Sequence, residues 1–80
     1  RLVILNPKNN SQTKNNFINV IGITDKDILI FINGQPVLVG DDGKFKENII
    51  LQPGINIINV RAINKFKKEI VQTIKVRCQQ

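Results

Sequence analysis

The chain of 80 residues contains no His, Trp, Tyr or Met, and only one Cys, one Ser and one Ala. Without His, neither a Ser-His-Asp triad nor a Cys-His pair can activate a nucleophile. Zinc sites draw on Cys, His and carboxylate clusters, and the first two are missing or solitary. The sequence has no GxxxxGK[ST] or GxGxxG loop that would hold a phosphate. We therefore expect a protein that is not an enzyme and that uses no cofactor.

Cys78 is the only cysteine, so no disulfide can form within the chain. We interpret it as an inert thiol at the margin of the fold, with lipid attachment or pairing with another chain as alternatives. No run approaches the ~20 apolar residues that a membrane span requires, so we expect no membrane attachment through this domain itself. The sequence opens at Arg1 without Met, and we expect a domain excised from a longer protein.

What the chain does have is an excess of β-branched residues, with Ile, Val and Thr accounting for 25 positions. Such side chains lose χ1 freedom in helices and pack well on sheets. Short β-branched runs are separated by turn signals of the kind that reverse a chain between antiparallel strands. These signals are Asn33-Gly34, Asp41-Asp42-Gly43 and Pro53-Gly54. The spacing is typical of a small antiparallel sandwich.

We predict seven strands, at residues 2–5, 17–23, 28–33, 36–39, 45–51, 55–63 and 69–76. Residues 8–16 contain no apolar side chain and are predicted as a loop with a short edge segment near Thr13, where a strand can also change sheets. The strand count favours an all-β, immunoglobulin-like antiparallel β-sandwich forming a single domain over residues 1–80. Period-two alternation predicts an inward-facing set: Ile18, Val20, Gly22, Ile28, Ile30, Ile32, Val37, Val39, Phe45, Ile49, Leu51, Ile58, Val60, Ala62, Ile74 and Val76.

Four motifs together resemble a known family. They read VIGIT at residues 20–24, IFING at 30–34, DGKF at 42–45 and LQPGINIINVRAIN at 51–64. The combination is similar to the bacterial immunoglobulin-like accessory domains of the glucodextranase B type, over roughly residues 17–77. One departure stands out: relatives usually carry Gly in the last hairpin, where this chain has Lys65-Phe66-Lys67-Lys68. A longer or differently turned tip with an exposed aromatic among lysines is therefore expected.

The resemblance implies a non-catalytic structural or interaction module of a bacterial cell-envelope or surface protein, hence an extracytoplasmic location. Its role would be spacing, docking or protein–protein contact. Three alternatives remain open: an accessory domain of a polysaccharide-acting enzyme, the outer domain of a single-span membrane protein, or a basic module that binds an anionic polymer. We expect a protein partner, either a neighbouring domain or another chain. Neither a small-molecule substrate nor a nucleic acid is expected.

A partner surface is predicted on the outward faces of the third, sixth and seventh predicted strands, which should be neighbours in one sheet. Its members are Leu29, Phe31, Ile57, Arg61, Ile63 and Val71. An exposed apolar area of this extent marks a contact surface. Lone apolar residues on a tolerant surface, or a register shifted by one residue, are the competing interpretations.

Charge is concentrated in the second half, because residues 44–80 carry eight basic and two acidic side chains whereas residues 1–43 are balanced. The predicted basic patch comprises Lys44, Lys46, Lys65, Lys67, Lys68, Lys75 and Arg77. Attraction to an anionic surface is one interpretation and solubility the other.

Four carboxylates fall in loops that a sandwich would bring to one end: Asp25, Asp27, Asp41 and Asp42. Oxygen clusters of this kind bind calcium. Asp is also a common turn residue, and we expect turns and no metal, with calcium as the alternative.

Overall fold

The computed structural model describes residues 1–79 and contains eight strands in that part of the chain. The strands are β1 (Leu2–Asn6), β2 (Ser11–Thr13), β3 (Phe17–Thr24), β4 (Leu29–Ile32), β5 (Gln35–Val37), β6 (Lys44–Ile50), β7 (Gly54–Ile63) and β8 (Glu69–Cys78). All seven predicted strands are present. The eighth is β2, which lies where the sequence indicated a short edge segment.

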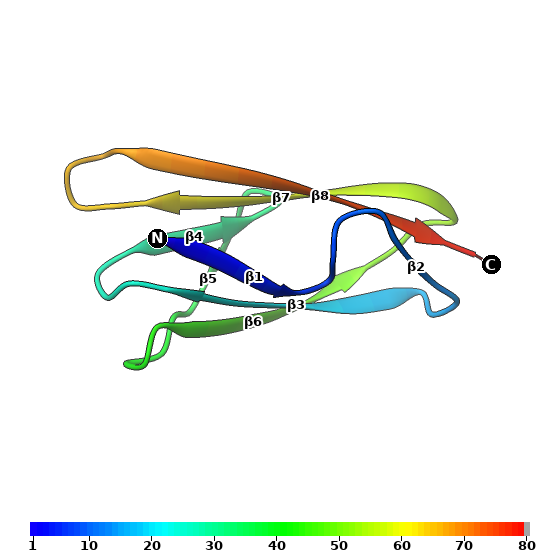
Figure 1. Cartoon of the computed structure of the whole chain (residues 1–80), viewed down its shortest axis with the longest axis horizontal. Helices are drawn as coiled ribbons and strands as arrows, with labels where there is room; N and C mark the ends of the chain where they lie inside the picture. Colours follow the sequence, from blue (N-terminus) through cyan, green and yellow to red (C-terminus); the bar gives the residue numbers. More distant parts are fainter. Residues whose placement is uncertain (80) are drawn as a thin grey trace.

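The strands form two facing sheets (Figure 1). One has three strands in the order β1-β3-β6, and the other has five in the order β2-β8-β7-β4-β5. Neighbours are antiparallel except for β2 and β8, which run parallel. The prediction of an immunoglobulin-like sandwich is therefore confirmed.

The chain changes sheets between β1 and β2, which settles the course of residues 6–16. β1 pairs with β3 up to Asn6, with an irregularity in register after Ile4. The next residue is the buried Pro7, joined to Asn6 by a cis peptide bond. Proline has no N–H to donate, so the ladder cannot continue through it. After this break, Ser11–Thr13 pair with the end of β8 in the other sheet.

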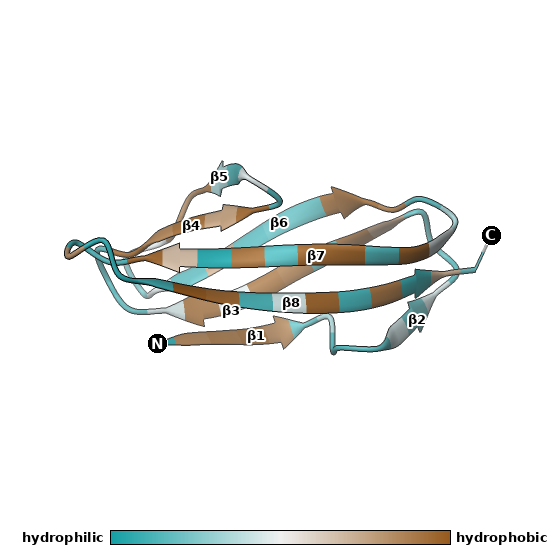
Figure 2. Cartoon of the chain, turned by 90° about the horizontal axis from the view of Figure 1, so that it is seen from above, coloured by the Kyte–Doolittle hydropathy of each residue, from teal (hydrophilic) through white to brown (hydrophobic). Residues whose placement is uncertain are grey.

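The core lies between the two sheets, and the residues predicted from period-two alternation to face inward line it. Along β7 and β8, hydrophobic and polar residues alternate (Figure 2). All sixteen residues predicted to face inward are buried or partly buried. The most deeply buried are Ile30, Ile32, Ile58, Val20, Val60 and Val76.

Cys78 corrects the sequence-based interpretation. Its side chain is only 2% exposed and belongs to the core, not to the margin. Because β2 covers the end of β8, the thiol is enclosed, and Sγ lies 3.2 Å from the carbonyl oxygen of Asn15. Leu2 is also a core residue that the alternation argument missed, since β1 is too short to show a clear period.

Gly22 lies where the Phe45 ring and the backbone of β1 approach closely. A Cβ atom there would overlap the Phe45 ring and lie 2.9 Å from the carbonyl oxygen of Val3, so no larger residue fits without a shift of its neighbours.

At the corner before β7, the Asn56 side chain binds the backbone. Its Oδ1 accepts from the Gln52 N–H at 2.9 Å, and its Nδ2 donates to the Gln52 carbonyl at 2.8 Å.

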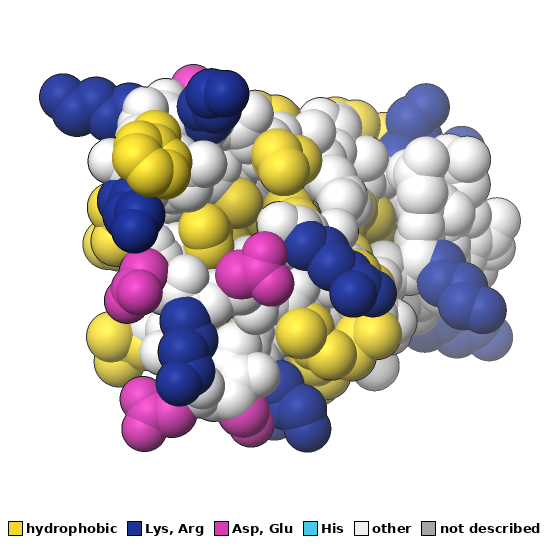
Figure 3. Space-filling view, turned by 60° about the vertical axis from the view of Figure 1, so that its left-hand side comes forward, with side chains coloured by type: hydrophobic (Ala, Val, Ile, Leu, Met, Phe, Trp, Pro, Cys, Tyr) yellow, Lys and Arg dark blue, Asp and Glu magenta, His cyan; other side chains and the backbone are white. Residues whose placement is uncertain are grey.

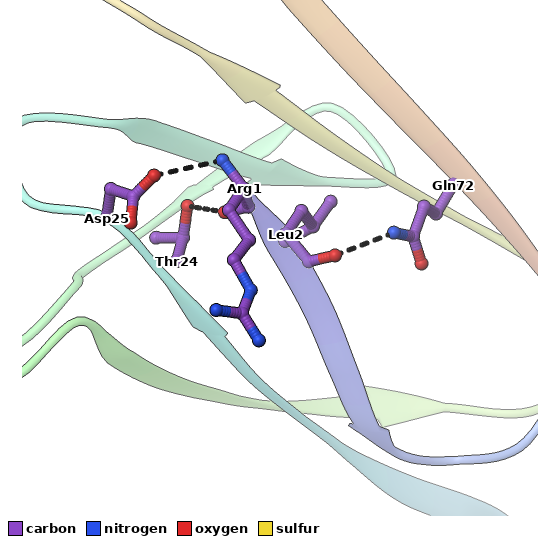
Figure 4. A network of polar contacts seen from close by, with 5 residues as sticks. All are labelled: Arg1, Leu2, Thr24, Asp25 and Gln72. Carbon is purple, nitrogen blue, oxygen red and sulfur yellow. Dashed lines mark hydrogen bonds and ion pairs between the residues drawn. The ribbon is translucent and has the colours of Figure 1, made fainter.

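Polar side chains on β8, on β3 and in the loop after β3 bind the start of β1 (Figure 4). Gln72 Nε2 donates to the carbonyl oxygen of Leu2 at 2.9 Å, and Thr24 Oγ1 donates to that of Arg1 at 2.7 Å. The backbone nitrogen of Arg1 lies 3.0 Å from Asp25 Oδ2. Within residues 1–79 the structure has no helix of the length and apolarity needed to cross a lipid bilayer.

Candidate contact surface

The outer face of the five-stranded sheet brings most of the predicted partner surface together. Leu29 on β4 lies opposite Ile63 on β7, and Phe31 lies opposite Arg61 in the next outward row. Arg61 is in turn opposite Val71 on β8. Leu29 is 62% exposed and Val71 is 56% exposed, so this part of the prediction describes a continuous surface across three strands. We call Leu29, Phe31, Arg61, Ile63 and Val71 the outer-face patch.

Arg61 contacts two neighbours on the outer face while its side chain stays 44% exposed. Its guanidinium carbon lies 4.9 Å from the centre of the Phe31 ring, and its Nη1 lies 3.1 Å from Glu69 Oε1. An exposed cation–π contact contributes roughly 0.5–1 kcal/mol, and an exposed ion pair roughly 0–1 kcal/mol. The two contacts favour an orientation of Arg61 across the patch, which places a polar group among its apolar side chains.

The patch continues beyond the edge of the sheet to residues that sequence reasoning did not single out. Pro36 on β5 lies opposite Phe31, and Leu38 just after β5 is 94% exposed. A hollow of about 390 Å³ lies here and is lined by Leu29, Phe31, Pro36 and Leu38 among others. The signal was in the sequence, since inward Val37 and Val39 leave Leu38 pointing outward.

Ile57 does not join the outer-face patch. A polar row separates them, in which Thr73 Oγ1 donates to Asn59 Oδ1 at 3.2 Å. Ile57 instead lies opposite Lys75. The predicted six-residue surface is thus a patch of five neighbours and one outlier.

The opposite face of the sandwich carries a second, smaller apolar area that the sequence analysis did not identify. Leu5, Phe17 and Ile50 are exposed on the three-stranded sheet. Asn19 and Asn48 divide this face, with Asn48 Nδ2 donating to Asn19 Oδ1 at 3.1 Å. The face is less continuous than the outer-face patch and provides matched positions for control variants.

The seven residues of the predicted basic patch do not gather at one place. Lys44 and Lys46 lie on β6 in the small sheet, whereas Lys75 and Arg77 lie near the end of β8 in the large sheet. The other three, Lys65, Lys67 and Lys68, belong to the β7–β8 hairpin tip. The charge excess therefore forms three separate groups, of which only the tip is a compact cluster.

The four aspartates considered for calcium serve other contacts or stand alone. Asp42 Oδ1 accepts from the Lys44 N–H at 3.0 Å, as a turn residue does, and Asp25 Oδ2 accepts from the backbone nitrogen of Arg1 at 3.0 Å. Over residues 1–79, no three or more Asp, Glu, His or Cys side chains come together in an arrangement that could hold a metal ion.

The β7–β8 hairpin tip, residues 64–68, is a compact turn closed by backbone and side-chain hydrogen bonds. The Asn64 N–H donates to the Lys68 carbonyl at 3.0 Å, and the Lys67 N–H donates back to the Asn64 carbonyl at 2.9 Å. Asn64 Oδ1 also accepts from the N–H groups of Phe66 and Lys68, at 2.9 and 3.0 Å. Lys67 has a φ of +63°, the conformation that glycine adopts most easily.

Over residues 1–79 the chain is thus an immunoglobulin-like β-sandwich whose five-stranded sheet carries the outer-face patch. The family model described as "Glucodextranase, domain B" matches residues 1–80, and the chain belongs to this family. Fibronectin(III)-like modules of CbhA from Clostridium thermocellum are structurally similar, with a TM-score of 0.68 and 14% sequence identity over 100% of this chain and 98% of that chain. At this identity the similarity shows the fold. No curated protein matches the sequence.

Proposed function

We propose that this domain is a rigid spacer that docks a neighbouring domain through the outer-face patch, as an accessory part of an extracytoplasmic polysaccharide-acting enzyme. The family name supports the enzyme context, because it describes a domain of a glucodextranase. The absence of His and the solitary Cys support a role outside catalysis.

The outer-face patch is the observation that carries the docking role. An exposed apolar area continuous across β4, β7 and β8, with one oriented arginine in it, has the composition of an interface core, where aromatic residues and arginine are enriched. The scattered lysines argue against the alternative of a single extended site for an anionic polymer. The absence of Trp and Tyr argues against direct glycan stacking.

The docking role is tested by sedimentation equilibrium over a concentration series, at low salt and at about 0.5 M NaCl, where charge attraction reaches only a few Å. We expect concentration-dependent self-association that persists at high salt. When no neighbouring domain covers the outer-face patch, two copies of the chain can bury their exposed apolar patches against each other. The double variant Leu29→Lys/Val71→Lys should abolish this self-association. The control Ile50→Lys places a lysine on the opposite face, at a residue 66% exposed, and should leave association unchanged.

A chain that stays monomeric at every concentration, or one that Ile50→Lys disrupts equally, would contradict self-association through this face and leave the spacer role or docking of a different partner. The enzyme context has its own test in the gene that encodes the chain. An adjoining polysaccharide-cleaving domain agrees with the proposal, and a cytoplasmic regulatory domain behind a single membrane span contradicts it.

A further inference from the structure

The β7–β8 hairpin tip has a composition that the docking role does not use. Phe66 is 72% exposed at its apex, and three of the four residues 65–68 are lysines. The Lys65 Nζ lies 5.4 Å from the centre of the Phe66 ring. We propose that this tip is a contact point for an anionic lipid surface, with the Phe66 ring entering the interface and Lys65, Lys67 and Lys68 binding lipid phosphates.

The turn constrains the backbone that carries the ring. Asn64 Oδ1 accepts from the backbone N–H groups of Phe66 and Lys68, and two backbone hydrogen bonds close the turn beneath them. A backbone already held in a turn loses little conformational freedom when its side chain inserts, which favours binding. The conformation also does not require Lys67, since glycine adopts this φ without steric cost. The third lysine is therefore not explained by the fold.

The tip also protrudes further along the long axis than the two acidic loops at the same end. The β7–β8 hairpin extends beyond the loops that precede β4 and β6 at the same end of the long axis (Figure 1). Seen from that end, Lys and Arg side chains surround a hydrophobic one at one corner, and acidic side chains lie mainly elsewhere (Figure 3). Contact at this corner leaves Asp25, Asp27, Asp41 and Asp42 in water.

A lipid surface fits these features better than a protein does. A specific protein interface buries about 800 Å² on each partner, and a five-residue tip with one apolar side chain falls well short of this. A bilayer interface accepts one protruding aromatic ring without a matching pocket, and aromatic residues are enriched at that depth. Anionic headgroups attract each nearby lysine. The proposal replaces our sequence-based expectation of no membrane contact through this domain, and it does not depend on the outer-face patch.

Vesicle co-sedimentation of the whole chain tests the proposal, with phosphatidylcholine alone compared against phosphatidylcholine containing about 30% phosphatidylglycerol. We expect binding only to the anionic vesicles. Phe66→Ala should weaken it about ten-fold through lost apolar burial. Lys65→Gln/Lys67→Gln/Lys68→Gln should weaken it about 100-fold, at about five-fold for each lysine.

The matched control, Lys46→Gln/Lys75→Gln/Arg77→Gln, removes the same charge away from the tip and should weaken binding less than about ten-fold. Circular dichroism melts establish that each variant is folded. Because the chain has no Trp, the emission of F66W reports on position 66 alone and should shift to shorter wavelength on anionic vesicles.

Three results would overturn the proposal. The first is no binding to anionic vesicles at low salt. The second is equal loss in the tip triple variant and its control, which would mean that only net charge matters. The third is binding to soluble polyphosphate but not to vesicles, with Phe66→Ala without effect, which would assign the tip to a soluble polyanion.

Discussion

Asparagine side chains accept hydrogen bonds from backbone N–H groups at several places in the chain. Asn33 Oδ1 accepts from the Asn59 N–H at 2.9 Å, and Asn9 Oδ1 accepts from the Lys75 N–H at 2.8 Å. Asn56 and Asn64 do the same at the two ends of β7. Side chains of this type bind nearby backbone groups readily. Several of the eleven asparagines thus stabilise the turns that hold the strands in register.

Lys67 leads to a prediction at the same scale. A left-handed residue other than glycine costs roughly 1–2 kcal/mol, while glycine costs roughly 0.4–1 kcal/mol through the unfolded chain. Lys67→Gly should therefore increase the free energy of unfolding by about 0.5 kcal/mol in a urea titration. Lys65→Gly, at a residue without positive φ, should decrease it. If both variants lose stability equally, the turn at Lys67 is not strained in solution.

At the scale of the strand, β6 shows how an exposed edge is kept from pairing. It is an edge of the three-stranded sheet, and Glu47 lies on its core-facing side opposite the fully buried Val20. An inward-pointing charge on an edge strand opposes the addition of another strand, because a neighbour would bury it. Glu47 remains only partly buried as long as the edge is free.

Replacing this charge should allow the β6 edge to pair with a strand of another molecule. Glu47→Val is expected to retain or gain stability in urea while forming larger oligomers than the parent chain forms at the same concentration. Size-exclusion chromatography with light scattering measures the oligomers. Glu47→Gln is the control, because it keeps shape and polarity and should associate less than Glu47→Val. Unaltered association in Glu47→Val would show that the edge is protected by other means.

The longer strands were predictable from sequence because they carry a period-two pattern and several are joined by turns at Asn33-Gly34, Gly43 and Gly54, where φ is positive. The sheet change after Pro7 was not, since the three residues of β2 are polar and acquire strand geometry only by pairing with β8. The burial of Cys78 follows from that same pairing. For the site, alternation identified the outer-face patch but could not show that the polar row of Asn59 and Thr73 separates Ile57 from it.

At the scale of the whole molecule, Cys78 is a natural reporter of unfolding. Its thiol is 2% exposed, and two neighbouring strands enclose it through the pairs Thr13–Cys78 and Gly54–Cys78. We expect the native protein to react with Ellman's reagent at least ~100-fold more slowly than the urea-unfolded chain, with reactivity following the global transition. Rapid reaction without denaturant would show that β2 detaches from β8 on its own.

The parallel pairing of β2 with β8 has a mechanical consequence. β2 is near the start of the chain and β8 near its end, and Arg1 and the end of β8 lie toward opposite ends of the long axis, which measures 41 Å (Figure 1). When the domain is tethered at both ends and stretched, the two parallel strands are pulled in opposite directions along their length. The hydrogen bonds between them lie across the pull and share the load, so they must break together instead of one after another. The three residue pairs between β2 and β8 are therefore expected to resist stretching of the domain.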